Sequence, residues 1–289
     1  MMVEQLRRNV NRNVENLVNL QNQLSSGKRL SKPSDDPQAL SQAMKLKASL
    51  DQGSQFLRNI NSVKGWLSAT DTALDQLSSV LVRARDVALR GSSDTLGADE
   101  RKLLAAQVGS LLQEALQAVN ATHEGCYIFS GHRVKTVPFP DAVTPYQGDG
   151  GLMEREIDFS VVMDVNLPGN VQVGGVEVLP TALAALRDLQ DHLNANDSAA
   201  LGGDVDQLTQ SVGQVLDLRG IVGVGVNRVD ATEKALNMEQ VDLAMLLSRA
   251  QDADMAEVMT KLMTQEGVYR AALATGARVM QPSLLDFLM

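Results

Sequence analysis

Residues 201–250, LGGDVDQLTQSVGQVLDLRGIVGVGVNRVDATEKALNMEQVDLAMLLSRA, carry the pattern that decides the fold of this chain. Apolar residues recur there at alternating intervals of four and three residues: Leu201, Val205, Leu208, Val212, Val215, Val222, Val226, Val229, Leu236, Leu243, Leu247 and Ala250. Three polar residues, Arg219, Glu233 and Gln240, occupy the remaining positions of this seam. The spacing is close to the coiled-coil repeat of about 3.5 residues and predicts a long amphipathic helix.

The seam continues toward the end of the chain with one change of spacing. From Ala250 the steps are of four residues, through Asp254 to Leu262, and the earlier spacing resumes at Gln265 and reaches Val279. Proline is absent from Thr181 until Pro282. We therefore interpret the change as a stutter within one helix. A seam of this length needs partner helices from the same chain, and any excess must find them on another molecule.

The N-terminal residues repeat the pattern. A stripe of three-four spacing consists of Val3, Leu6, Val10, Asn13, Leu17, Leu20 and Leu24. Asn13 is the polar member, and a buried asparagine of this kind can fix the register of paired helices. An ordinary surface helix on a globular core would show the same periodicity, so both interpretations stay open. A helix-breaking segment follows, and Asp36 before Pro37 predicts the start of the next helix.

The clearest helical hairpin lies between residues 60 and 122. Its first helix shows the seam Ile60, Val63, Leu67, Thr70, Leu74, Leu77, Leu81, Ala84 and Ala88. Gly91–Ser93 ends that helix, residues 94–98 form the turn, and the return helix runs to the region of Thr122 with the same spacing. Two long helices joined by a short polar loop predict an antiparallel pair. With the C-terminal helix alongside, we expect an elongated antiparallel helical bundle formed by both chain ends.

The composition changes after His123. Tyr127–Phe129 is expected to be a short strand, and residues 134–180 are rich in Gly, Pro, Val and Asp. Runs at Glu156–Val162 and Val171–Val178 predict further strands. A helix at Thr181–Asn194 and a loop at Asn194–Gly203 lead into the final seam. The expected fold class is mainly α with a smaller β-rich inserted domain.

Composition excludes several classes of protein. Hydrophobic residues make up 44% but aromatic residues only 3%, which suits narrow helical packing. The net charge of -9 argues against nucleic acid or an anionic membrane as the main partner. The single cysteine, Cys126, excludes an internal disulfide. No apolar run approaches a membrane span, and the start MMVEQLRRNV lacks the apolar core of a signal peptide.

An enzymatic or metal site would have to use His123, Cys126 and His132. A Cys/His pair can act as a nucleophile with its base, or bind zinc with further ligands. The nearest additional ligands, Glu124 and Asp141, do not form a recognised spacing. Nucleotide-binding and hydrolase motifs are absent from the sequence. We expect no catalytic residue, no cofactor and no metal ion.

Five segments resemble the bacterial flagellin family. LSSGKRLSKPSDDPQAL (24–40), LRGIVGVGVNRVDA (218–231) and SLLDFL (283–288) are similar to the terminal signatures of that family. GCYIFSGHR (125–133) and PFPDAVTPYQGDGG (138–151) resemble its hook-associated branch. The family motif residues carried over to this chain are Asp35, Asp36, Pro37, Arg219, Gly223, Asn227 and Arg228.

The resemblance implies a structural component of the flagellum rather than an enzyme. Terminal helices would polymerise by coiled-coil-like assembly, and the middle of the chain would face outward. The hook-associated branch implies a junction layer, a ring of self-associating copies between the first hook-associated protein and flagellin. It also implies secretion by type III export, with an export chaperone, to the extracellular flagellum. Neither nucleic-acid binding nor membrane insertion is expected.

This reading divides the chain into four parts. Residues 1–45 and 251–289 would be the N- and C-terminal polymerisation segments, and residues 46–133 with 204–250 a helical rod. Residues 134–203 would form the outward-facing β-rich domain with its helix.

The apolar stripes suggest which residues would lie between subunits. The expected interface residues are Val10, Leu17, Leu20, Leu24, Val258, Leu262, Tyr269, Leu284, Leu285 and Phe287. A filament flagellin subunit is one alternative function, and a cytoplasmic coiled-coil adaptor is another. The β-rich insert and the GCYIFSG segment favour the junction layer over the filament subunit.

Overall fold

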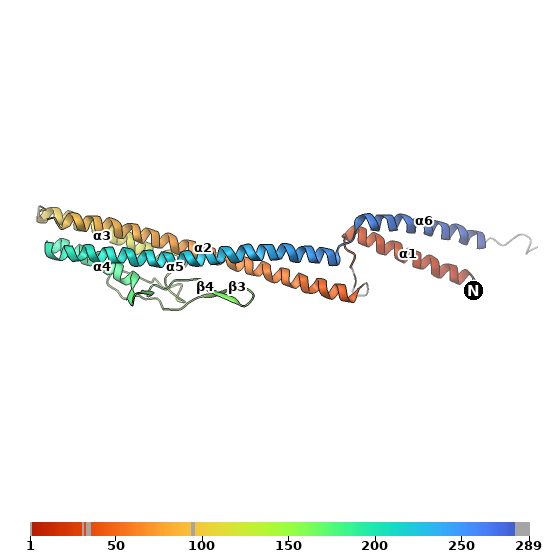
Figure 1. The fold of residues 1–289 in the computed structure, drawn as a ribbon, viewed down its shortest axis with the longest axis horizontal. Helices are drawn as coiled ribbons and strands as arrows, with labels where there is room; N and C mark the ends of the chain where they lie inside the picture. Colours follow the sequence, from red (N-terminus) through yellow and green to blue (C-terminus); the bar gives the residue numbers. More distant parts are fainter. Residues whose placement is uncertain (1, 31, 33–35, 94–95, 281–289) are drawn as a thin grey trace, which may run out of the picture. The chain divides into compact units, whose positions relative to one another are not determined.

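The computed structural model of the protein describes residues 2–30, 32, 36–93 and 96–280 (Figure 1). Within this part of the chain, helices dominate and short strands occur only between the third and fourth helix. The helices are α1 (Met2–Ser26), α2 (Pro37–Gly91), α3 (Ala98–Val119), α4 (Val178–Ala195), α5 (Ser198–Gln251) and α6 (Met255–Met280). The predicted fold class, mainly α with a small β-rich insert, is confirmed.

The chain forms two compact units. The central unit consists of residues Gly53–Asn237, and the terminal unit combines Met1–Gln52 with Met238–Met289. Helices α2 and α5 contribute residues to both units. The four-part division expected from the sequence remains a proposal.

The central unit packs α3, α4, residues 53–91 of α2 and residues 198–237 of α5 around one apolar cluster. All nine positions of the α2 seam, from Ile60 to Ala88, are buried. In the α5 seam, two of the three polar positions, Arg219 and Glu233, form ion pairs with α2. The Arg219 guanidinium lies 2.9 Å from Asp71 Oδ1 and 2.6 Å from Asp75 Oδ1. Glu233 Oε2 accepts from Lys64 Nζ at 2.8 Å, so polar residues enter the seam where α2 offers an opposite charge.

The loop between α4 and α5 is shorter than the predicted loop Asn194–Gly203, and that prediction is wrong. Asn196 ends α4 in the left-handed conformation, with a φ of 55°. Asp197 Oδ1 then accepts the backbone N–H groups of Ala199 and Ala200, at 3.1 and 3.2 Å. This side-chain cap starts α5 at Ser198. Two glycines that suggested a loop, at 202 and 203, therefore lie inside the first turns of the helix.

The predicted stutter near residue 252 is also wrong, because α5 ends at Gln251 and a separate helix begins at Met255. Asp254 Oδ1 accepts the N–H groups of Ala256 and Glu257, at 2.9 and 3.2 Å, and so caps α6. The break is also held from outside. Ala253 donates its N–H to the carbonyl oxygen of Gly27 at 2.9 Å, and Gln251 accepts from Arg29 N–H at 2.8 Å.

The strands form three antiparallel two-stranded hairpins. They are β1 (Thr122–His123) with β2 (Cys126–Tyr127), β3 (Glu154–Asp158) with β4 (Val161–Asp164), and β5 (Gln172–Val173) with β6 (Val176–Glu177). The runs Glu156–Val162 and Val171–Val178 were predicted as strands, but each spans the turn of a hairpin instead. In the second, the turn is made by Gly174 and Gly175, whose φ values are +62° and +83°.

Two motif segments, GCYIFSG and YQGDGG, pack against each other. The Tyr146 hydroxyl lies 2.7 Å from the carbonyl oxygen of Phe129 and accepts the Gly169 N–H at 3.2 Å. Gly131 has a φ of +69°, and a Cβ there would lie 2.1 Å from the carbonyl oxygen of Asp149. A side chain at position 131 is therefore excluded on both grounds. Contacts between the two motifs hold the beginning of the insert in a compact arrangement.

Candidate assembly surface

The terminal unit is built on the pair α1–α6, whose helices lie side by side (Figure 1). The predicted stripe on α1 is half-buried at each described position from Leu6 to Leu24. On α6, Val258 and Gly276 are buried, and Leu262 and Tyr269 are half-buried. The two stripes face each other, so the sequence predicted both contact faces correctly.

Two contacts set the register of this antiparallel pair. Gln265 Nε2 donates to Asn13 Oδ1 at 3.1 Å, so the polar member of the α1 stripe meets a polar member of the α6 stripe. Near the other end, Leu6 packs over Gly276, where a Cβ would lie 2.8 Å from Leu6 Cδ2. A paired polar contact at one level and a close apolar contact at another disfavour a slip of one helix along the other.

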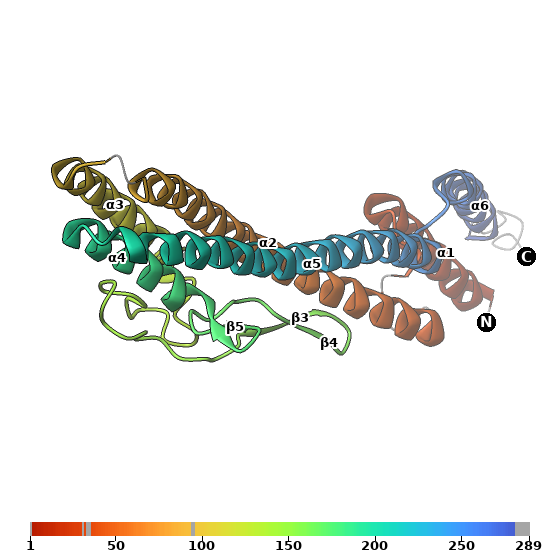
Figure 2. The same cartoon turned by 60° about the vertical axis from the view of Figure 1, so that its left-hand side comes forward.

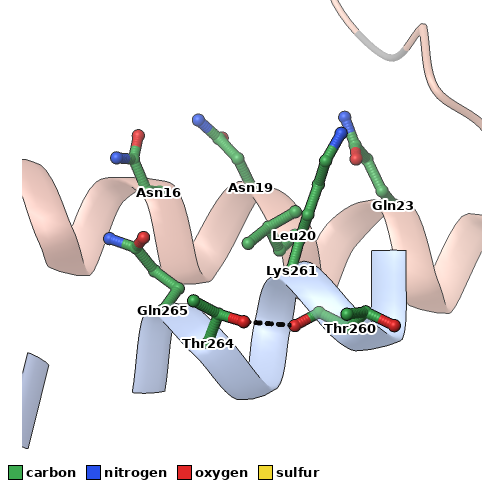
Figure 3. Close-up of a pocket in the computed structure, with 8 residues that line it drawn as sticks. All are labelled: Asn16, Asn19, Leu20, Gln23, Thr260, Lys261, Thr264 and Gln265. Carbon is green, nitrogen blue, oxygen red and sulfur yellow. Dashed lines mark hydrogen bonds between the residues drawn. The ribbon is translucent and has the colours of Figure 1, made fainter. Parts of the chain in front are cut away.

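A groove runs between α1 and α6 beside these contacts (Figure 3). Its walls carry mostly uncharged hydrogen-bonding side chains, and a single cation: Asn16, Asn19, Leu20, Gln23, Thr260, Lys261, Thr264 and Gln265. Thr264 Oγ1 donates to the Thr260 carbonyl oxygen at 2.9 Å, so the hydroxyl oxygen can still accept a hydrogen bond. Uncharged polar groups cost less to bury than charges when a partner completes their hydrogen bonds. The groove is suited to contact with another polypeptide.

Other apolar faces of the terminal unit are uncovered. Among the described residues of this unit, Leu30, Ala43 and Val258 are the buried apolar residues. Large apolar side chains that are between 39% and 70% exposed include Val14, Val18, Val241, Met245, Met259, Met263, Val268 and Leu273. A monomeric soluble protein rarely exposes a large contiguous apolar patch. We call these exposed side chains of α1, α6 and the end of α5 the outer terminal face, and they are candidates for contacts with neighbouring subunits.

The structure places the predicted interface residues differently from this outer face. Seven of them lie on the contact stripes of α1 and α6: Val10, Leu17, Leu20, Leu24, Val258, Leu262 and Tyr269. Their contact between subunits remains a prediction. Leu284, Leu285 and Phe287 lie outside the described residues. Sequence reasoning missed the outer face, although Val14 and Val18 each follow a stripe position directly and could have indicated it.

The family motif residues have separate structural roles. Asp36 Oδ1 accepts the N–H groups of Gln38 and Ala39, at 3.1 and 3.0 Å, and caps α2 at Pro37. Arg219 forms the ion pairs with α2 described above. Gly223, Asn227 and Arg228 are exposed on α5, and Asp35 lies outside the described residues.

The three residues of the Cys/His constellation make separate contacts. His123 pairs with Cys126 across β1 and β2, but its ring stands edge-to-face on Trp66, with centroids 5.8 Å apart. His132 Nε2 lies 3.0 Å from the carbonyl oxygen of Leu152 instead. Across the described ranges, no group of three or more His, Cys, Asp or Glu side chains could hold a metal ion. None of the helices described is long and apolar enough to span a membrane.

Known protein families and known proteins match most of this chain. The bacterial flagellin N-terminal helical region matches residues 1–133, and the bacterial flagellin C-terminal helical region matches residues 205–288. Flagellar hook-associated protein 3 of Escherichia coli (strain K12) is 24% identical over an alignment 294 residues long, gaps included. The alignment covers 94% of this chain and 93% of that protein. A flagellin of Halalkalibacterium halodurans is 25% identical over 274 residues, covering 95% of this chain and 92% of that protein.

A solved structure supports the same fold. The crystal structure of Bacillus cereus FlgL superposes with a TM-score of 0.63 at 19% identity, and the match covers 71% of this chain and 99% of that one.

Proposed function

The chain belongs to the bacterial flagellin family of structural flagellar proteins, and from this premise we propose that it forms the junction layer between hook and filament. In this proposal it acts as a structural protein and not as an enzyme. Copies associate side by side in a ring, with the first hook-associated protein on one side and flagellin on the other. The chain reaches that position outside the cell by type III export, assisted by a chaperone.

The observation that carries this proposal is the outer terminal face. A single copy covers the α1–α6 stripes but leaves the apolar side chains of α6 and of the end of α5 in water. Full burial of one such side chain is worth about 1.5–3 kcal/mol. Several of them, buried together, provide enough free energy for stable association with neighbouring subunits. The groove in Figure 3 adds hydrogen-bonding groups along the same two helices.

The insert favours the junction layer over the filament subunit. The relatives include both hook-associated proteins and flagellins at similar identity, so identity alone does not separate the two functions. The segments that resemble the hook-associated branch pack against each other through Tyr146 and Gly131. This contact gives those motifs a structural reason in this chain, which supports the hook-associated function.

A deletion strain tests the proposal. For a junction protein, cells without this gene keep their hooks, lack filaments, and accumulate intact flagellin in the medium. Filaments that persist in the deletion strain would instead indicate a minor filament subunit. Absence of the protein from purified wild-type flagella would support the cytoplasmic adaptor.

A variant pair connects this phenotype to the outer terminal face. Met263→Asp places a charge on that face, whereas Leu103→Asp places the same charge on a side chain of α3 that is exposed to a similar degree, 70% against 73%. We expect Leu103→Asp to restore filaments in the deletion strain and Met263→Asp to fail. Equal restoration by both variants would argue against the outer terminal face as an assembly surface.

A further inference from the structure

Phe159 differs from every other phenylalanine in the described residues. Phe56, Phe129 and Phe139 are at most 6% exposed, but Phe159 is 74% exposed. It occupies the two-residue turn between β3 and β4, in the central unit. Aromatic side chains, phenylalanine among them, are enriched at protein interfaces relative to the rest of the surface.

The hairpin holds Phe159 in a fixed, outward position. The Phe159 N–H donates to Asp158 Oδ1 at 2.7 Å, and the Ser160 N–H donates to Glu156 Oε1 at 3.2 Å. The side chain of Ile157 is fully buried, and Asn59 of α2 donates its Nδ2–H to the Glu156 carbonyl oxygen at 2.7 Å. Figure 2 shows the hairpin running out past the other strands of the insert. Its tip therefore presents an aromatic ring flanked by two carboxylates.

A matching groove lies between the far end of β4 and α5. Its apolar walls include Leu152, Met163, Ile221 and Val224, and its volume is about 370 Å³. Gly225 leaves room for Met163, whose Cε would lie 3.0 Å from a Cβ at that position. The groove is thus an apolar hollow beside an exposed helix face.

Two residues of opposite charge, Arg228 and Asp164, line this groove. Arg228 lines it and forms no ion pair with any residue that the structure describes. Asp164 lines it as well, so a carboxylate would be attracted by Arg228 and repelled by Asp164. A ligand with an aromatic ring and a neighbouring carboxylate would fit with its ring on the apolar wall and its carboxylate toward Arg228.

The hairpin tip has this chemistry, but it cannot enter the groove of its own chain. Met163 belongs to the groove and lies four residues beyond Phe159, which at about 3.3 Å per residue is roughly 13 Å along the strand. The tie to Asn59 and the buried Ile157 prevent the hairpin from folding back. Only another copy of the chain can supply this tip to this groove.

We propose that Phe159 of one copy inserts into the β4–α5 groove of the neighbouring copy, with Asp158 directed toward Arg228. The contact is heterologous, because the tip and the groove are different surfaces, and repeated contacts of this kind generate rings or helical assemblies. The inference rests on the proposed function, since the junction layer is what brings copies side by side. It adds a lateral contact, made by the insert, to the association of the terminal unit.

Disulfide cross-linking in assembled flagella tests this contact. Cys126 is first replaced by Ser, and the deletion strain then expresses two full-length chains together, one with Ser160→Cys, which keeps the Phe159 ring, and one with Val224→Cys. A matched control pairs Ser160→Cys with Val143→Cys, because Val143 is 73% exposed elsewhere in the central unit. We expect at least about tenfold more cross-linked dimer from the first pair, because a disulfide requires Cα atoms within about 7 Å. Each variant expressed alone should give only the background level.

The outcomes separate this contact from the proposed function. Filaments together with the specific cross-link support both. Normal filaments with no cross-link above the control, or with Ser160→Cys joined to a flagellar protein of different mass, overturn the contact and leave the junction function intact. If the unsubstituted chain fails to restore filaments, the proposed function and the contact that rests on it are both overturned.

Discussion

The central and terminal units share the three-four spacing of apolar residues, but they bury their apolar side chains to different degrees. In the central unit, four helices enclose the seams, and one continuous apolar cluster extends from Phe56 to Leu236. In the terminal unit, α1 and α6 cover each other's stripe and leave further apolar side chains exposed, with only three buried apolar residues among those described. The same periodicity therefore accompanies a completed core in one unit and an incomplete one in the other. A seam identifies the face that a helix buries, but not whether its remaining faces are covered.

The largest effect we expect separates the two units by leucine truncation. Leu74 is fully buried in the central cluster, so Leu74→Ala should lower the free energy of unfolding by about 2–5 kcal/mol. Leu20 is half-buried beside a groove, and Leu20→Ala should cost less than about 1 kcal/mol because neighbouring groups and water already share its surface. Trp66, the single tryptophan, belongs to the central unit, and its fluorescence in a urea titration reports on that unit.

In an assembly assay, Leu20→Ala should have a larger effect than Leu74→Ala. Leu20→Ala should leave the Trp66 transition unchanged but reduce filament formation in the deletion strain. If Leu20→Ala shifted that transition as far as Leu74→Ala does, the two units would unfold as one, and the comparison between them would be wrong.

Much of the helical architecture could be predicted from the sequence. Each described position of the seams from Ile60 to Ala88 and from Leu201 to Ala250 is at least half-buried. These positions depend on local spacing, which the sequence shows directly. The polar position at Asn13 was also visible, but its partner Gln265 lies 252 residues away and is identified only once the helices are paired.

The failures share a different cause. The break between α5 and α6 depends on the side-chain cap at Asp254 and on the carbonyl oxygen of Gly27, which comes from the other end of the chain. The spacing of apolar residues in the sequence reveals neither contact. The exposure of Phe159 was equally hidden, because the run Glu156–Val162 looks like one strand until the turn divides it. Long-range contacts and turn positions thus limited the prediction.

A smaller effect should show how closely the terminal helices approach. Gly276→Leu places side-chain atoms where Leu6 now lies, and we expect a loss of about 1–3 kcal/mol in the pairing of α1 with α6. Gly267→Leu is the control, because it lies in the same helix with nothing within 4 Å of its Cβ position. Thermal unfolding followed by far-ultraviolet circular dichroism measures both.

A second substitution checks the mechanism. Combined with Leu6→Ala, Gly276→Leu should regain most of the lost stability, since the shortened side chain makes room for the new one. Failure of this rescue would show that Gly276 does not act through Leu6, and the register of the terminal pair would then need another explanation.

The smallest effect we expect is a pH dependence of stability in the central unit. The three histidines of the chain, at positions 123, 132 and 192, belong to the central unit. His192 Nδ1 lies 2.8 Å from Oδ2 of Asp204, which is 4% exposed. The hydrogen bond to Asp204 raises the pKa of His192, and the charges of Asp204, Asp188 and Asp197 raise it further, whereas partial burial of the ring lowers it. Burial raises the pKa of Asp204, although its contact with His192 opposes that shift.

The direction of the pH dependence follows from the raised pKa of His192. The folded protein holds this proton more tightly than the unfolded chain, so the stabilisation is complete below the ordinary pKa of about 6.5 and is lost as pH rises through the raised value. His192→Gln keeps a hydrogen-bond donor for Asp204 but cannot be charged. The stability difference between the original chain and this variant should stay below about 1 kcal/mol, because the imidazole is partly solvated. It should be larger at pH 6 than at pH 9 in the Trp66 transition, and absent at both pH values from the pairing of α1 with α6. A difference that did not change with pH would mean that the hydrogen bond alone, without the charge, joins α4 to α5 at this point.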